Sequence, residues 1–149
     1  MIKIMMLHGV NHNMFGKRDP KQYGTITLDQ INEMIDKKAA ELGVTVTKYQ
    51  TNHEGEMVEK IHEAYREGYD GVCINAGAWT HYSYAIHDAL EILECPTVEL
   101  HMSNIHKRDV FRNNSVISTV ATGAIFGFGE YVYPLGIQAI VDMVEKNKK

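Results

Sequence analysis

The sequence predicts a doubly wound α/β domain, in which a parallel sheet lies between two layers of helices. Short apolar runs typical of buried strands alternate five times with longer segments of helical periodicity. No internal repeat or linker-like stretch interrupts this alternation. The length of 149 residues suits one domain with one sizeable core. We therefore expect residues 1–149 to form a single domain.

The strands are expected where apolar or alternating runs end at turn residues. The run 2–7 precedes a long polar loop that continues to Gly24, and the other runs are bounded by glycine, proline or polar residues. The five predicted strands are 2–7, 44–50, 71–74, 97–101 and a segment within 116–128. A flavodoxin-like strand order, 2-1-3-4-5, is the first choice for such a chain.

The helices are predicted from capping residues and apolar spacing. Thr27 precedes the first helix with Gln30 three residues later, which is a capping box, and Gly43 ends that helix. A second helix opens within 51–56 and stops at Gly68, and further helices are expected at 83–93 and 135–144. The apolar stripe of the second helix is Met57, Val58, Ile61, Ala64 and Tyr65.

Composition excludes several classes of protein. The formal net charge of -4 argues against a nucleic-acid binder. Cys73 and Cys95 make no disulfide framework, and no segment is apolar and long enough for a membrane span or a signal-peptide core. A reducing, cytoplasmic setting is the expectation that follows. The glycines in 123–129 do not form a dinucleotide fingerprint, and we interpret them as sites of close packing.

Polar side chains gather where the predicted strands end. Because ligands of doubly wound sheets bind outside the carboxyl ends of the strands, this grouping predicts a site. The candidates that follow strands one, three and four are Asn11, Arg18, Tyr23, Asn75, His81, Glu99, His101, Ser103 and Arg112. For the loop 7–24 a solvated surface loop is the alternative to an active-site loop.

These residues suggest proton transfer on a small polyhydroxylated carboxylate. Glu99 and His101 are two apart on a strand, so they share a face, and a carboxylate beside an imidazole can orient it as a general acid. A structural ion pair is the alternative. Arg18 near Tyr23 would favour a phenolate able to abstract a proton. Arg112 could clamp a carboxylate, and Arg108 could do the same or cap a helix end.

No cofactor or metal is expected. The eight histidines show no HExxH or comparable ligand motif, and a Walker-type phosphate loop is absent. No lysine lies in a clearly apolar strand, so a Schiff-base mechanism has no candidate.

Five spaced motifs resemble those of the type II 3-dehydroquinate dehydratases and cover nearly the whole chain. Residues 7–24 are similar to the family's LNGPNxNxLGxRxPxxYG, and 50–55 to its QSNHEG. Residues 74–81 are similar to INAGAYTH, 98–106 to VEVHLSNIH and 108–112 to REEFR.

The resemblance implies a single catalytic domain that removes water from 3-dehydroquinate by reversible anti-elimination, without a cofactor. The product is 3-dehydroshikimate, in the shikimate pathway or in quinate breakdown. By resemblance Tyr23 is the base, Arg18 stabilises its phenolate, and Asn11 holds a water at the enolate. His101, oriented by Glu99, protonates the departing hydroxyl.

The resemblance also implies how the substrate and the neighbouring subunits are held. The implied substrate-binding residues are Asn75, His81, Met102, Ser103, Arg112 and, from a neighbouring subunit, Asp88. The family forms dodecamers, as tetramers of trimers, and its first loop closes as a lid.

This chain departs from the family pattern without losing a catalytic group, so we expect it to be active. Altered lid dynamics or substrate affinity are the effects that we expect from the departures. The departures are His8, Val10, Trp79, His87 and Val132. Two other functions stay open: a small-ligand binding module without turnover, and a hydrolase that uses His101 and Glu99 on water.

Overall fold

A five-stranded parallel sheet organises the part of the chain that the computed structural model describes, which is residues 1–17, 21 and 24–148. Its strands pair in the order β2-β1-β3-β4-β5, which confirms the predicted flavodoxin-like topology. The strands are β1 (Lys3–His8), β2 (Thr45–Gln50), β3 (Gly71–Asn75), β4 (Thr97–His101) and β5 (Gly123–Phe126).

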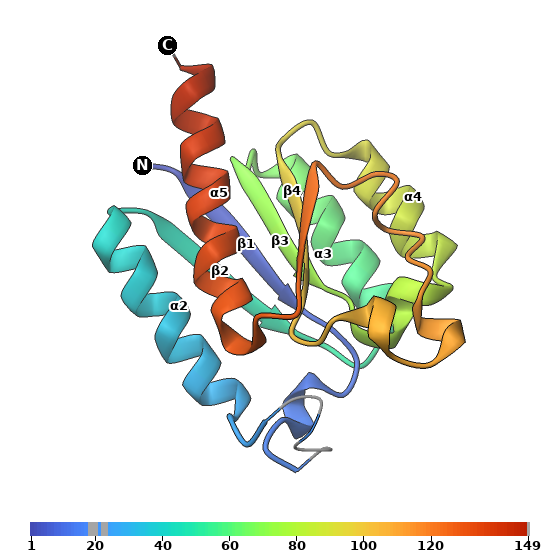
Figure 1. Cartoon of the computed structure of the whole chain (residues 1–149). Helices are drawn as coiled ribbons and strands as arrows, with labels where there is room; N and C mark the ends of the chain where they lie inside the picture. The colour runs from blue at the N-terminus through green and yellow to red at the C-terminus, as the bar shows by residue number, and fades with distance from the viewer. Residues whose placement is uncertain (18–20, 22–23, 149) are drawn as a thin grey trace.

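Helices cover both faces of this sheet, as predicted (Figure 1). Helices α2 (Leu28–Leu42) and α5 (Val132–Asn147) lie on one face, and α3 (Glu54–Arg66) and α4 (Tyr84–Ile92) lie on the other. Alternate residues of β1 enter the two cores: Ile4 and Met6 pack with α2 and α5, whereas Met5 and Leu7 pack with α3 and α4. Among the described residues, no helix is both long and apolar enough to span a membrane.

The predicted capping box is confirmed. The Thr27 hydroxyl accepts a hydrogen bond from the Gln30 backbone N–H at 3.2 Å, and the Gln30 side chain accepts one from the Thr27 N–H at 2.9 Å. Gly43 ends α2 in the left-handed conformation, with φ of 65°. Local sequence alone therefore fixes both ends of this helix.

Two local predictions were wrong, the second of them in part. Tyr65 is exposed, because the buried stripe of α3 runs through Met57, Ile61 and Ala64, and the next residue already points outward. The close packing predicted for the glycines in 123–129 holds for Gly127, where a Cβ would lie 3.3 Å from Asn104 Cβ, but not for Gly123 and Gly129, which have open space there. Gly127 and Gly129 also have φ of 89° and 59°, which suits glycine in the turn into α5.

His8 is a buried polar residue at the carboxyl end of β1. It is 1% exposed, and its Nε2–H donates to Asn32 Oδ1 on α2 at 2.9 Å. Burial lowers the pKa of His8 to about 4; the Asn32 hydrogen bond opposes that shift and the charge of Lys48 adds to it. The imidazole is therefore neutral in the folded protein near pH 7.

We predict that His8 makes the fold sensitive to acid. The unfolded chain binds a proton at His8 below pH 6.5 and the folded chain only below about 4, so stability falls as the pH falls through this window. The loss reaches roughly 3 kcal/mol at its lower end. Urea unfolding of the wild type and His8→Asn at pH 7.0 and 4.5 measures it.

His8→Asn should lose less stability on acidification than the wild type does. His53→Asn, at an exposed histidine, is the matched control and should behave like the wild type. Equal acid losses in all three proteins would contradict the prediction.

Candidate active site

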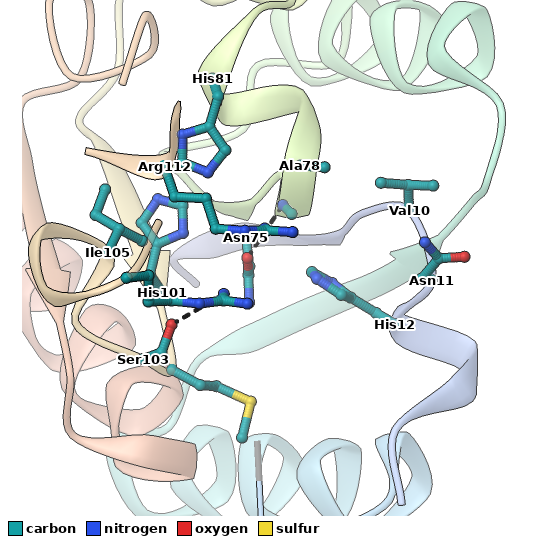
Figure 2. A pocket seen from close by; sticks show the side chains of 13 residues that line it. Val10, Asn11, His12, Asn75, Ala78, His81, His101, Ser103, Ile105 and Arg112 are labelled. Atoms are coloured by element: carbon teal, nitrogen blue, oxygen red, sulfur yellow. Dashed lines mark hydrogen bonds between the residues drawn. The ribbon is translucent and has the colours of Figure 1, made fainter. Parts of the chain in front are cut away.

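A cleft opens at the carboxyl ends of β1, β3 and β4, where the sequence predicts a site (Figure 2). The sheet register brings these ends together, since His8 pairs with Asn75 and Ile74 pairs with Glu99. The predicted residues that line it are Asn11, Asn75, His81, His101, Met102, Ser103, Arg108 and Arg112.

Glu99 and His101 form a buried pair in the wall of this cleft. Their side chains are on the same face of β4, as predicted, and His101 Nε2–H donates to Glu99 Oε2 at 2.7 Å. Glu99 is 0% exposed and His101 is 5% exposed. With Nε2 bound to Glu99, Nδ1 is the ring nitrogen left to exchange a proton with a ligand.

Two serines complete the surroundings of Glu99. Nothing in the sequence indicated their role. Ser115 Oγ donates to Glu99 Oε2 at 2.6 Å, and the Ser118 hydroxyl donates to Oε1. Burial alone would raise the pKa of Glu99, but the hydrogen bond and charge of His101, with both hydroxyls, hold that pKa below its usual value. The residue is therefore an ionised carboxylate that can stabilise a protonated His101.

Asn75 presents its amide to the cleft from the end of β3. Its Nδ2 donates to the Tyr133 hydroxyl at 2.9 Å, and its Oδ1 accepts from the Gly77 N–H at 3.2 Å. Burial raises the pKa of Tyr133, and the Asn75 hydrogen bond only partly opposes this, so the phenol stays protonated. Both ends of the amide are thus fixed before a ligand binds.

His81 lies on the turn η2 (Gly77–His81) and is held as a neutral imidazole. Its Nδ1–H donates to the Asn114 carbonyl at 2.7 Å. Burial lowers the pKa of His81; the Asn114 carbonyl opposes this, and the charges of His101, Arg112 and Arg108 lower it further. Nε2 is left as an acceptor, which suits a ligand hydroxyl.

Two guanidinium groups give the cleft a preference for anions. Arg108 Nη1 donates to Ser103 Oγ at 3.3 Å, and Arg112 Nε lies 3.7 Å from Asp109 Oδ2. Both side chains line the cleft, so Arg108 does more than end the short η3 helix (Ile105–Lys107). Fixed guanidinium groups recognise carboxylates well.

The first loop is held at its start by the end of β2. The Asn11 N–H donates to Asn52 Oδ1 at 2.8 Å, and Gln50 Nε2 donates to the Gly9 carbonyl at 3.1 Å. Asn11 has φ of 68°, a left-handed conformation that asparagine tolerates better than most residues. His12, which the sequence did not single out for this site, lines the cleft beside Asn11.

The remaining candidates are Arg18, Tyr23 and Asp88. Arg18 and Tyr23 lie outside the described residues. Asp88 is on α4 with its side chain 75% exposed, where its Oδ1 lies 2.7 Å from His87 Nδ1. In the part of the chain that the structure describes, no three His, Cys, Asp or Glu side chains are grouped as metal ligands would be.

Named proteins resemble the chain over nearly its whole length. A 3-dehydroquinate dehydratase of Leptothrix cholodnii is 60% identical over 147 residues, covering 99% of each chain. One of Syntrophotalea carbinolica is 57% identical, covering 97% of this chain and 98% of that protein.

Solved structures resemble it as well. The type II dehydroquinase of Butyrivibrio crossotus superposes with a TM-score of 0.92 at 40% identity, covering 94% of this chain and 97% of that one. That of Propionibacterium acnes gives 0.90 at 39% identity, covering 97% of both. The model of the family described as dehydroquinase class II matches residues 2–141. The chain therefore belongs to the class II dehydroquinase family.

Proposed function

We propose that the chain is a hydro-lyase that removes water from 3-dehydroquinate to give 3-dehydroshikimate. The observation that carries this proposal is the buried Glu99–His101 pair in the wall of a cleft that also holds two arginines. Such a site can bind a small carboxylate and protonate a leaving hydroxyl. The names of the relatives supply the substrate.

The first step is proton abstraction from the carbon beside the ketone. We assign Tyr23 as the base, with Arg18 stabilising its phenolate. The electron pair of the broken C–H bond moves to the ketone oxygen, which becomes an enolate. A water held by Asn11 hydrogen-bonds to that oxygen, while Arg112 and Arg108 hold the substrate as an anion.

The second step expels the hydroxyl as water. The enolate collapses, the C–O bond breaks, and His101 gives its Nδ1 proton to the departing oxygen. Because Nε2–H is bound to Glu99, the carboxylate stabilises the protonated ring before this transfer and orients it. Asn75, His81 and the Met102–Ser103 segment position the ring of the substrate.

The direct test follows the conjugated enone of the product by its ultraviolet absorbance. Wild-type protein should produce it from 3-dehydroquinate, and chelator treatment should leave the rate unchanged. Tyr23→Phe should reduce turnover at least 100-fold, since a general base contributes about 10²–10⁴, while ligand binding stays near wild type.

Each outcome separates the candidate functions. A folded wild type that binds substrate but yields no enone would be a binding module. Hydrolysis of another substrate without enone formation would favour the hydrolase. Residual turnover of Tyr23→Phe close to that of wild type would remove Tyr23 from its role.

A second prediction concerns the buried carboxylate. Glu99→Gln keeps the shape of the side chain but removes its charge, so a protonated His101 loses its stabilising partner. We expect kcat to fall about 100-fold or more. Ser118→Ala is the matched control, because it removes one hydrogen bond to Glu99 and keeps the charge. A smaller loss in Glu99→Gln than in Ser118→Ala would contradict the assignment.

We also propose that the chain assembles as a homododecamer, a tetramer of trimers, in which Asp88 reaches the cleft of a neighbouring subunit. The support is that Asp88 is exposed on α4 and does not line its own cleft. Val110 and Phe111, beside Arg112, are exposed apolar side chains that a neighbour could cover.

Sedimentation equilibrium should give twelve times the chain mass of 16.9 kDa; a monomer would refute this assembly.

The cellular setting that we propose is a reducing cytoplasm. Cys73 is buried and Cys95 is partly buried, and neither is in a disulfide. The reaction serves the shikimate pathway in aromatic biosynthesis, and the same step serves quinate breakdown.

A further inference from the structure

Tyr133 is a buried phenol in the first turn of α5 that the mechanism above does not use. It has no exposed surface, and its hydroxyl accepts a hydrogen bond from Asn75 Nδ2 at 2.9 Å. Because burial raises the pKa of Tyr133, this hydroxyl is neutral. A buried hydroxyl is unfavourable unless it is hydrogen-bonded, so the contact with Asn75 is the one through which Tyr133 can act on the cleft.

Two contacts decide which way the Asn75 amide points. The Gly77 backbone N–H can only donate, so the Asn75 atom that lies 3.2 Å from it is Oδ1. Nδ2 is then the atom beside Tyr133, and one of its two hydrogens goes to the phenol oxygen. In the part of the chain that the structure describes, no acceptor takes the second hydrogen, and Asn75 lines the cleft (Figure 2). Asn75 therefore offers an N–H donor to a ligand.

The position of the Tyr133 ring is fixed by close packing of α5 on the sheet. Three residues further along α5, a Cβ on Gly136 would lie 3.0 Å from Leu100 Cδ2 and 3.2 Å from Cys73 Sγ. A larger residue would keep the helix farther from β3 and β4. The ring of His8, 1% exposed at the end of β1, has its centroid 5.5 Å from that of Tyr133. Close packing of this kind leaves the phenol little freedom to move.

We propose that Tyr133 is a positioning residue for substrate binding, which fixes the Asn75 amide so that an Nδ2–H, rather than the carbonyl, meets an oxygen of the substrate. This inference rests on the proposed function and adds a residue on α5 to it. The amide is held in this way before a ligand binds, so the contact serves the bound substrate and the transition state alike. Its loss should therefore raise KM and leave kcat nearly unchanged.

The first test removes the phenol hydroxyl and keeps the ring. In Tyr133→Phe the Asn75 Nδ2 loses its acceptor, so the amide is no longer held in one orientation. We expect KM for 3-dehydroquinate to rise about 5- to 10-fold, which is the scale of one neutral hydrogen bond, and kcat to stay within about twofold of wild type. Tyr131→Phe is the matched control, because it removes the same atom from an exposed tyrosine and should leave both constants unchanged. A wild-type KM in Tyr133→Phe would overturn the proposal.

A double-mutant cycle separates this role from a general effect on the packing of α5. If Tyr133 acts through Asn75, Tyr133→Phe should change KM in the wild type and cause no further change in an Asn75→Ala background. If the hydroxyl serves only the packing of the helix, the two losses should multiply. Multiplied losses would overturn the proposal. All four proteins are assayed below the lowest of their unfolding midpoints, so that unfolded protein does not enter the comparison.

A measurement on the wild type does not depend on the folding of any variant. In protein labelled with ¹⁵N at asparagine side chains, the two Nδ2 hydrogens of Asn75 should give separate resonances. Saturation with 3-dehydroshikimate should shift one of them and leave the other, which is bound to Tyr133, near its ligand-free position. Equal shifts of both, or of neither, in an active, saturated enzyme would overturn the role of Tyr133. An inactive wild type would instead overturn the proposed function.

Discussion

The fixed wall of the cleft depends on a buried carboxylate. Glu99 has no exposed surface, and a buried charge without partners is strongly unfavourable. His101, Ser115 and Ser118 supply hydrogen bonds to its two oxygens. The chain from 115 to 118 must therefore lie against β4, and the Val116 N–H bond to the Thr80 carbonyl at 2.8 Å ties that segment to the η2 turn as well. One charge thus helps to position His101 and His81 together.

On the α2–α5 side of the sheet, neutral polar groups also require buried hydrogen bonds. His8 and Asn75 are register partners on β1 and β3, and each has a polar partner on the α2–α5 face: Asn32 for His8 and Tyr133 for Asn75. The His8 and Tyr133 rings are 5.5 Å apart. Polar groups in an apolar core are stable only where their hydrogen bonds are made. The packing of α2 and α5 on the sheet therefore holds Asn75, which lines the cleft, in one arrangement.

Sequence reasoning succeeded where the signal is local or periodic. The capping box, the strand order and the shared face of Glu99 and His101 follow from spacings of two to four residues and from general rules of chain topology. It failed where the partner is far along the chain. Ser115 and Ser118 are 16 and 19 residues from Glu99, and Tyr133 is 58 residues from Asn75. No sequence pattern around Ser115, Ser118 or Tyr133 indicates these contacts. Gly129 was interpreted as a packing site, but it has open space at the Cβ position and a positive φ that the turn requires.

One departure of this chain from its family, Val10, lies at a contact between the loop and the η2 turn. The Val10 carbonyl and the His12 ring both lie 3.1 Å from the position of a Cβ on Gly77, and the Val10 side chain lies 3.4 Å from it. A side chain at 77 would separate the start of the loop from the η2 turn, so the two surfaces fit only while residue 77 is glycine. Val10 is thus a packing surface on that turn, and it fixes the approach from which His12 faces the cleft. A change in the position of the loop at Val10 would therefore act on this contact with Gly77, in the turn that also carries His81.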